Sequence, residues 1–177
     1  MTSIVWFRQD LRLHDNCALA HAAARGPVLP LYILDETVPP RGRPLGGAQR
    51  WWLHHSLAAL EGSLGDVALL RGDPRELLPK VAGDAKATGV YWNRCYEPYA
   101  IAWDRGLKSD LTQAGLDVRS FNAALLHEPW EVQTGSGGPF KVYWPFWRAC
   151  LRLSTGWSKP CRTRVLVLSL SKDGPGI

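Results

Sequence analysis

Polar side chains follow three apolar segments of the chain, residues 4–7, 28–34 and 89–92, at the points where these segments end. Each lies within five residues of such an end, and the set includes Arg8, Gln9, Asp10, Arg12, Asp35, Asn93, Cys95 and Glu97. Ligands of open parallel α/β sheets bind just beyond the carboxyl ends of the strands, so polar groups at such ends are candidates for ligand binding. A plainer alternative stays open, in which Arg8 and Asp10 only pair with each other and hold a loop.

The apolar segments have the composition of strands in a parallel sheet. Residues 4–7, Ile-Val-Trp-Phe, form a continuous run of β-branched and aromatic side chains, as expected for a strand buried on both faces. These segments alternate along the chain with predicted helices, which indicates an α/β fold. We expect a five-stranded parallel, doubly wound (Rossmann-like) sheet with helices on both faces. Its strands are expected at 4–7, 28–34, 67–70, 89–92 and 115–121. Ligands of such sheets bind beyond the carboxyl ends of the strands, which is where the polar residues lie.

The clearest predicted helix covers residues 46–64. One apolar stripe along it is expected to hold the helix against the sheet, and the stripe consists of Leu53, Leu57, Leu60 and Leu64. Arg50 lies near the start of this helix. Because ligands also collect where a helix start meets strand ends, Arg50 joins the candidate binding residues.

Composition argues against membrane and metal sites. The 177 residues suffice for one domain with a core, and no apolar run approaches the roughly 18 residues that a membrane helix needs. The start lacks the basic-then-apolar pattern of a signal peptide, so we expect a cytoplasmic protein without membrane contact. The four cysteines are far apart and form no Cys-x-x-Cys pair, so no metal site is expected.

The formal net charge of +5 does not indicate a surface for duplex DNA. Residues 158–177 carry four Lys or Arg against one Asp, a balance of +3, which leaves only +2 for residues 1–157. A protein that grips phosphates should show clustered Lys and Arg, and no such cluster precedes residue 158. No Gly-x-Gly-x-x-Gly follows the first strand, so a dinucleotide site of the usual kind has no support.

The opening of the chain carries a specific pattern. The segment Trp6-Phe7-Arg8-x-Asp10-Leu11-Arg12-x-x-Asp15-Asn16-x-Ala18-Leu19 resembles the amino-terminal signature of the DNA photolyase and cryptochrome family. Further similar stretches cover residues 29–36, 47–57, 91–98, 121–130 and 139–149. The resemblance therefore extends over residues 1–153, and its motifs are ordered and specific.

The resemblance implies two domains with separate tasks. In this family an amino-terminal α/β domain holds a light-absorbing antenna chromophore, and an all-helical domain holds FAD, contacts damaged DNA and splits cyclobutane pyrimidine dimers. We expect residues 1–130 to be the antenna domain, residues 131–157 to lead toward a helical FAD domain, and residues 158–177 to be a tail unlike the family. As a fragment without that helical domain, the chain is expected to hold no catalytic residue and to be inactive alone. A join or frameshift near Trp157 is our hypothesis for the tail.

The resemblance also bears on the antenna chromophore. The positions that match the Asn-Glu pair of folate-binding members are Tyr99 and Ala100, which supply neither the amide nor the carboxylate. A deazaflavin or flavin is therefore favoured over a reduced folate. The cofactor-binding residues expected on this basis are Arg8, Asp10, Asp35, Arg50, Asn93, Cys95 and Glu97.

Three interpretations of the function are open from the sequence. The first is the light-harvesting domain of a photolyase-like enzyme, or its counterpart in a cryptochrome photoreceptor. The second is a free-standing nucleotide- or flavin-binding module, since one fold serves many functions. The third is a chain without function as it stands, because a helix over residues 143–153 would expose Phe146, Trp147 and Leu151, which should pack on another domain.

Overall fold

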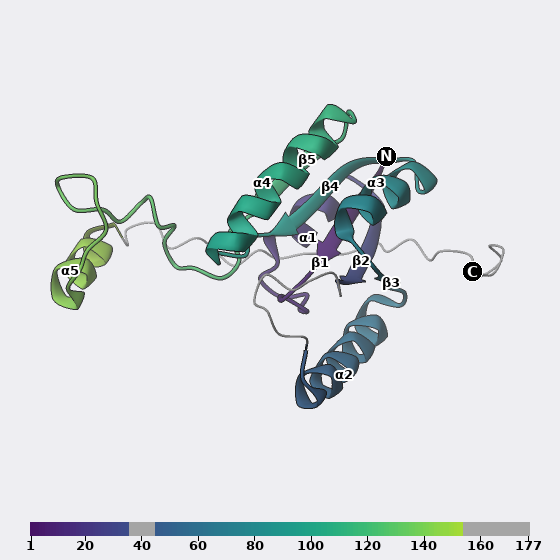
Figure 1. The fold of residues 1–177 in the computed structure, drawn as a ribbon, viewed down its shortest axis with the longest axis horizontal. Helices are drawn as coiled ribbons and strands as arrows, with labels where there is room; N and C mark the ends of the chain where they lie inside the picture. Colours follow the sequence, from purple (N-terminus) through teal and green to yellow (C-terminus); the bar gives the residue numbers. More distant parts are fainter. Residues whose placement is uncertain (36–44, 154–177) are drawn as a thin grey trace.

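The predicted strands form one parallel sheet in the computed structural model of the protein, which describes residues 1–35 and 45–153. The sheet has the strand order β3-β2-β1-β4-β5, with all neighbours parallel (Figure 1). The strands are β1 (Thr2–Phe7), β2 (Val28–Leu34), β3 (Ala68–Arg71), β4 (Ala87–Asn93) and β5 (Asp117–Phe121). The chain places β2 and β3 on one side of β1 and then β4 and β5 on the other side. The predicted doubly wound sheet is therefore confirmed. The predicted tail, residues 158–177, lies outside the described residues.

The register of the strands brings their carboxyl ends to one edge of the sheet. Phe7, the last residue of β1, pairs with Tyr32 of β2. Trp6 pairs with Trp92, one residue before the end of β4. The loops after β1 and β4 therefore start side by side, and the polar residues that follow these strands are brought together, as the sequence predicts.

Helices cover both faces of the sheet, as predicted. They are α1 (Cys17–Ala23), α2 (Gly47–Leu64), α3 (Pro74–Asp84) and α4 (Pro98–Gln113), with a further helix, α5 (Tyr143–Leu153), near the end of the described chain. Successive residues of a strand point to opposite faces and so feed two cores. Trp6 and Trp92 pack with α3 and α4 on one face, whereas Phe7 and Tyr91 pack with α1 and the end of α2 on the other.

Helix α2 departs from its prediction. Only Leu60 and Leu64, near its carboxyl end, are buried, whereas Leu53 and Leu57 are half-buried. Figure 1 shows the amino-terminal half of α2 standing away from the sheet. The expectation that the whole stripe packs on the sheet is therefore wrong. Hydrophobic burial anchors one end of the helix and leaves space beneath the other.

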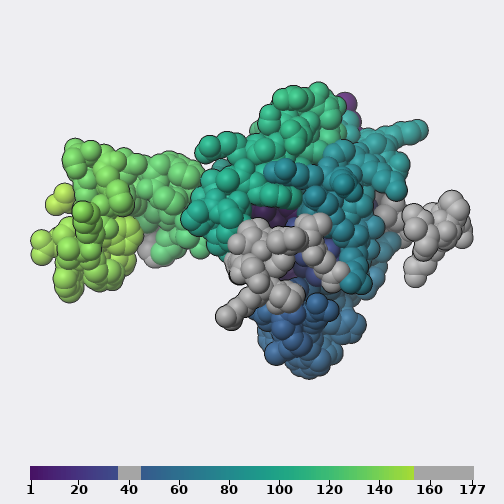
Figure 2. All heavy atoms as spheres, in the orientation of Figure 1, coloured from purple at the N-terminus to yellow at the C-terminus, as the bar shows by residue number. Residues whose placement is uncertain are grey.

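Helix α5 projects from the α/β body together with the segment that precedes it, drawn in green and yellow in Figure 2. Phe146 and Trp147 are each 39% exposed and Leu151 is 53% exposed, which confirms the exposure predicted from the sequence. Tyr143 stacks on Trp147, with 6.4 Å between ring centroids. The helix thus presents an aromatic face that the described residues leave largely uncovered.

A histidine of α1 packs against aromatic side chains of β4 and β5. His21 of α1 lies edge-on to Tyr91, with 4.8 Å between ring centroids, and its Nε2 atom is buried without a hydrogen-bond partner among the described residues. Burial lowers the pKa of His21, the charges of Arg119 and Arg25 lower it further, and Asp117 opposes them. The folded state therefore favours the neutral imidazole.

We expect the free energy of unfolding to decrease between about pH 7 and pH 5, because the unfolded chain binds the His21 proton more readily than the folded chain does. This contribution is fully present above the ordinary imidazole pKa of about 6.5 and is lost as the pH falls toward the lowered one. His21→Phe keeps a ring in place and should flatten the profile. Urea unfolding across this pH range measures the effect, and parallel profiles for the two proteins would contradict it.

Candidate functional site

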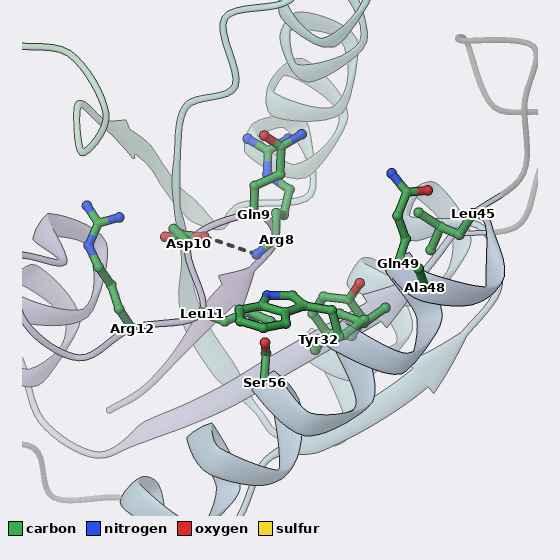
Figure 3. A pocket seen from close by; sticks show the side chains of 12 residues that line it. Arg8, Gln9, Asp10, Leu11, Arg12, Tyr32, Leu45, Ala48, Gln49 and Ser56 are labelled. Atoms are coloured by element: carbon green, nitrogen blue, oxygen red, sulfur yellow. Dashed lines mark hydrogen bonds between the residues drawn. The ribbon is translucent and has the colours of Figure 1, made fainter.

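An open cavity of about 760 Å³ lies between the amino-terminal half of α2 and the carboxyl ends of β1 and β2. It occupies the space that α2 leaves by standing away from the sheet. Residues 8–12 and Tyr32 form the strand side of the cavity (Figure 3). The helix side consists of Leu45, Ala48, Gln49, Trp52, Leu53 and Ser56. This volume is in the range of small-molecule sites.

The helix side of the cavity presents an exposed aromatic ring. Trp52 lines the cavity with an indole that is 69% exposed, and Tyr32 lies on the strand side. Burial raises the pKa of the Tyr32 phenol, which is therefore neutral at physiological pH. Trp51 is 62% exposed as well, but it lies outside the cavity lining and packs on His55, with 4.4 Å between ring centroids. Only one of these two neighbouring indoles is thus available to a ligand in the cavity.

Arg8 is held by an acid 96 residues further along the chain. Its guanidinium donates to both carboxylate oxygens of Asp104 on α4, at 2.8 and 2.9 Å, and to the Asn93 carbonyl at 2.8 Å. The guanidinium carbon also lies 4.7 Å from the ring centroid of Trp6. Arg8 therefore ties β1, β4 and α4 together, and its charge is balanced within the protein.

Asp10 and Asn93 bond to each other and to the start of α1. The Asn93 amide donates to a carboxylate oxygen of Asp10 and, at 2.8 Å, to Asn16 Oδ1. Asn16 caps α1 by accepting from the Leu19 N–H at 3.0 Å. The other oxygen of Asp10 accepts from the Arg8 N–H at 3.1 Å. Since Asn93 and Asn16 are buried, this network fixes the end of β1 from within.

Two of the seven predicted binding residues, Arg8 and Asp10, line the cavity. Asn93 lies in the buried network described above. Cys95 is half-buried, and burial raises the pKa of its thiol while the charge of Arg8 opposes that rise. Glu97 accepts a hydrogen bond from Gln9 Nε2 at 3.4 Å, in the loop after β4. The structure therefore gathers these five residues around the ends of β1 and β4.

The other two predicted residues lie further from this group. Arg50 is exposed on α2, and its Nε atom donates to the Leu45 carbonyl at 3.1 Å. Asp35 is exposed directly after β2. Neither is among the described residues that line the cavity. A binding role for any of the seven residues stays a prediction.

Sequence reasoning missed three residues that shape this region, namely Tyr32, Trp52 and Asp104. One of them left a signal: Asp104 lies four residues after Ala100 and three before Leu107, on the inner face of α4, and both neighbours are buried. A carboxylate on a buried helix face needs a cationic partner. The other two carry no sequence signal that separates a cavity residue from a core or surface residue.

Metal and membrane sites find no support in residues 1–35 and 45–153. No cluster of three or more His, Cys, Asp or Glu side chains in these ranges could hold a metal ion. None of the helices in the same ranges is both long and apolar enough to span a bilayer.

Comparison with known proteins decides the family. The model of the DNA photolyase family matches residues 3–163 of the chain. The chain belongs to the DNA photolyase family. A deoxyribodipyrimidine photo-lyase of Agrobacterium fabrum is 52% identical to it over 151 residues, and cryptochrome-1 of Arabidopsis thaliana is 40% identical over 156 residues. The crystal structure of a bacterial class III photolyase from Agrobacterium tumefaciens matches with a TM-score of 0.80 at 49% identity.

These photolyase-family relatives are much longer than the chain. The three matches cover 82%, 85% and 90% of the chain but only 31%, 23% and 33% of the respective relatives. The chain therefore spans a third or less of their length. The crystal structure of an archaeal photolyase from Sulfolobus tokodaii, which holds two FAD molecules, matches with a TM-score of 0.61 at 24% identity, over 73% of the chain and 31% of that protein.

The photolyase-family signature at residues 6–19 has a structural explanation. The Arg8 guanidinium donates to Asp104, and the carboxylate of Asp10 accepts from the Arg8 N–H and from the Asn16 amide. Asn16 in turn accepts from the Leu19 N–H in the first turn of α1. They thereby hold the loop after β1 in one shape. The signature thus builds the strand side of the cavity.

Proposed function

We propose that this photolyase-family domain binds a planar antenna chromophore in the cavity between α2 and the ends of β1 and β2. The observation that supports this most strongly is the exposed Trp52 indole on the cavity wall, with Tyr32 on the opposite side. An indole left in water forgoes favourable burial, and a flat ring stacked on it would restore that burial. Asp10 at the end of β1 lines the same cavity, and its carboxylate can accept one more hydrogen bond from the ring edge besides those from Arg8, Asn16 and Asn93.

Within this proposal a flavin or deazaflavin is favoured over a reduced folate. Tyr99 and Ala100 stand where folate-binding members resemble one another in an Asn-Glu pair. Ala100 is 8% exposed on the inner face of α4 and brings no polar group to a ligand. The cavity lies on the side of α2 instead, next to residues 8–12.

We also propose that the domain harvests light for a photolyase-like enzyme that repairs cyclobutane pyrimidine dimers in the cytoplasm. The relatives are about three times as long as the chain, so they have ample sequence for a helical domain that binds FAD and damaged DNA. The aromatic face of α5 supports this, since its exposed Tyr143, Phe146 and Trp147 suit packing against such a domain. Catalysis would then belong to that domain.

A cryptochrome-type photoreceptor is the second candidate. The 40% identity to cryptochrome-1 of Arabidopsis thaliana favours it. In both cases the task proposed for this domain is to hold the chromophore in the same cavity.

A reconstitution experiment tests chromophore binding. The purified chain is incubated separately with FMN, a deazaflavin, a reduced folate and ATP, and each mixture is passed through gel filtration. We expect a flavin or deazaflavin absorption band to remain with the protein. Retention of folate alone would overturn the chromophore class, retention of ATP alone would favour a nucleotide-binding module, and retention of none would contradict the proposed function.

A further inference from the structure

Helix α5 presents two adjacent rows of side chains with different chemistry. Residues that are four positions apart lie one turn apart on the same side of a helix. The first row is aromatic, with Tyr143 stacked on Trp147 at 6.4 Å between ring centroids. The second row begins with the exposed Trp144 and continues with the exposed Arg148 and Arg152. The helix therefore carries an aromatic strip with two cations along one border.

Another side of α5 is turned toward the segment that precedes the helix. The ring of Phe146 lies edge-on to that of Phe140, with 6.3 Å between ring centroids, and Cys150 is only 6% exposed. Figure 2 shows this unit projecting from the α/β body. Tyr143 remains 63% exposed and Trp147 remains 39% exposed. The described residues thus leave the aromatic row open to a partner.

The charge of this part of the chain is entirely positive. Residues 132–153 contain Lys141, Arg148 and Arg152 but neither Asp nor Glu. Within residues 1–35 and 45–153, neither Arg148 nor Arg152 forms an ion pair or a side-chain hydrogen bond. A partner that packs on the aromatic row brings its own side chains beside these two guanidinium groups. Carboxylates there are attracted, whereas Lys or Arg side chains are repelled.

We propose that α5 binds a helix whose apolar stripe is bordered by Asp or Glu side chains. A helix that docks through one face uses anchors one turn apart, which is the spacing of Tyr143 and Trp147. The aromatic anchors supply most of the affinity, and the charged border selects the partner. This inference rests on the proposed packing of α5 against a helical domain, and it names the chemistry of the helix that makes this contact.

Two synthetic helical peptides test the inference, because they share one leucine stripe and differ only in carrying Glu or Lys beside it. Fluorescence anisotropy of each labelled peptide, titrated with the full 177-residue chain, gives two dissociation constants. We expect the Glu peptide to bind about tenfold more tightly than the Lys peptide at low salt, and the ratio to shrink as salt is added. Trp147→Ala should weaken the binding of both peptides, whereas Trp51→Ala, at an exposed indole on α2, should weaken neither.

Two double variants separate the local charge of α5 from the net charge of the chain. Arg148→Gln with Arg152→Gln keeps good helix formers in place and should lower the ratio to about twofold. Lys80→Gln with Arg105→Gln removes the same charge from exposed sites on α3 and α4, and it should leave the ratio near its original value. An equal fall in both double variants would show that only net charge acts, and it would overturn the inference.

The peptide results also separate this inference from the proposals on which it rests. Equal binding of the two peptides by the unmodified chain would overturn the acidic border, while the packing of α5 on a helical domain stands. Binding of neither peptide would overturn that packing as well. Chromophore retention is measured without any peptide, so its failure would overturn the antenna proposal and leave the peptide ratio as it is.

Discussion

Replacing Trp52 with alanine should weaken chromophore binding about ten- to a hundredfold, whereas Trp51→Ala should change it by less than about twofold. A ring stacked on an aromatic side chain contributes about 1–3 kcal/mol, and each 1.4 kcal/mol is about a factor of ten in affinity. Trp52 lines the cavity, but Trp51, its neighbour on α2, does not. The two indoles are thus similarly exposed, but only that of Trp52 faces the cavity in which the chromophore is proposed to bind.

The pair of variants is closely matched. The indoles are 69% and 62% exposed, so removing either one should cost little stability. Dissociation constants for FMN measured on both variants and on the unmodified chain, together with urea unfolding of each, give the comparison. Trp52 should also account for most of the tryptophan fluorescence that FMN quenches at close range. Equal loss of affinity in both variants would place the chromophore outside this cavity.

The sheet could be predicted from the sequence because its signal is local. Residues 4–7 are apolar throughout, and a strand buried on both faces requires that pattern at every position. This strand contributes to the cores on both faces of the sheet, with Trp6 in one core and Phe7 in the other. Turn and cap residues then mark the ends, as Asn16 does at the start of α1. Each of these features is set within a few residues of the chain.

The cavity could not be predicted, because it depends on the angle between α2 and the sheet. The even leucine stripe indicates which face of the helix turns inward, but it does not tell how far along the helix the sheet extends. Leu60 and Leu64 reach the core, and Leu53 falls on the cavity wall instead. The accessibility of Trp52 follows from that tilt.

The candidate site was only partly predictable for a related reason. Sequence placed Arg8, Asp10 and Asn93 at one edge of the sheet, and the structure confirms that they meet. It could not tell whether they face a ligand or satisfy one another. Asn93 bonds to Asp10 across 83 residues and Arg8 bonds to Asp104 across 96, and such long-range pairings leave no local pattern.

Asp104→Ala should lower the free energy of unfolding by about 3–5 kcal/mol, the cost of removing one partner from a buried ion pair. The side chains of Arg8 and Asp104 are 13% and 14% exposed, so the guanidinium left behind would have little access to water. The Trp92 indole N–H, which donates to Asp104 at 3.1 Å, would lose its acceptor as well. Urea unfolding of the variant and of the unmodified chain at pH 7 measures the difference.

The double variant Arg8→Met, Asp104→Leu serves as the control, because it removes both charges and fills the space with apolar side chains. It should recover most of the lost stability, since the penalty of the single variant comes from an unpaired charge rather than from lost attraction. A cost of less than about 1 kcal/mol for Asp104→Ala would show instead that water reaches the pair, as in surface ion pairs. Arg8 would then be free to turn toward the cavity, and the binding role that the sequence predicts for it would gain support. A large cost confines Arg8 to holding β1, β4 and α4 together.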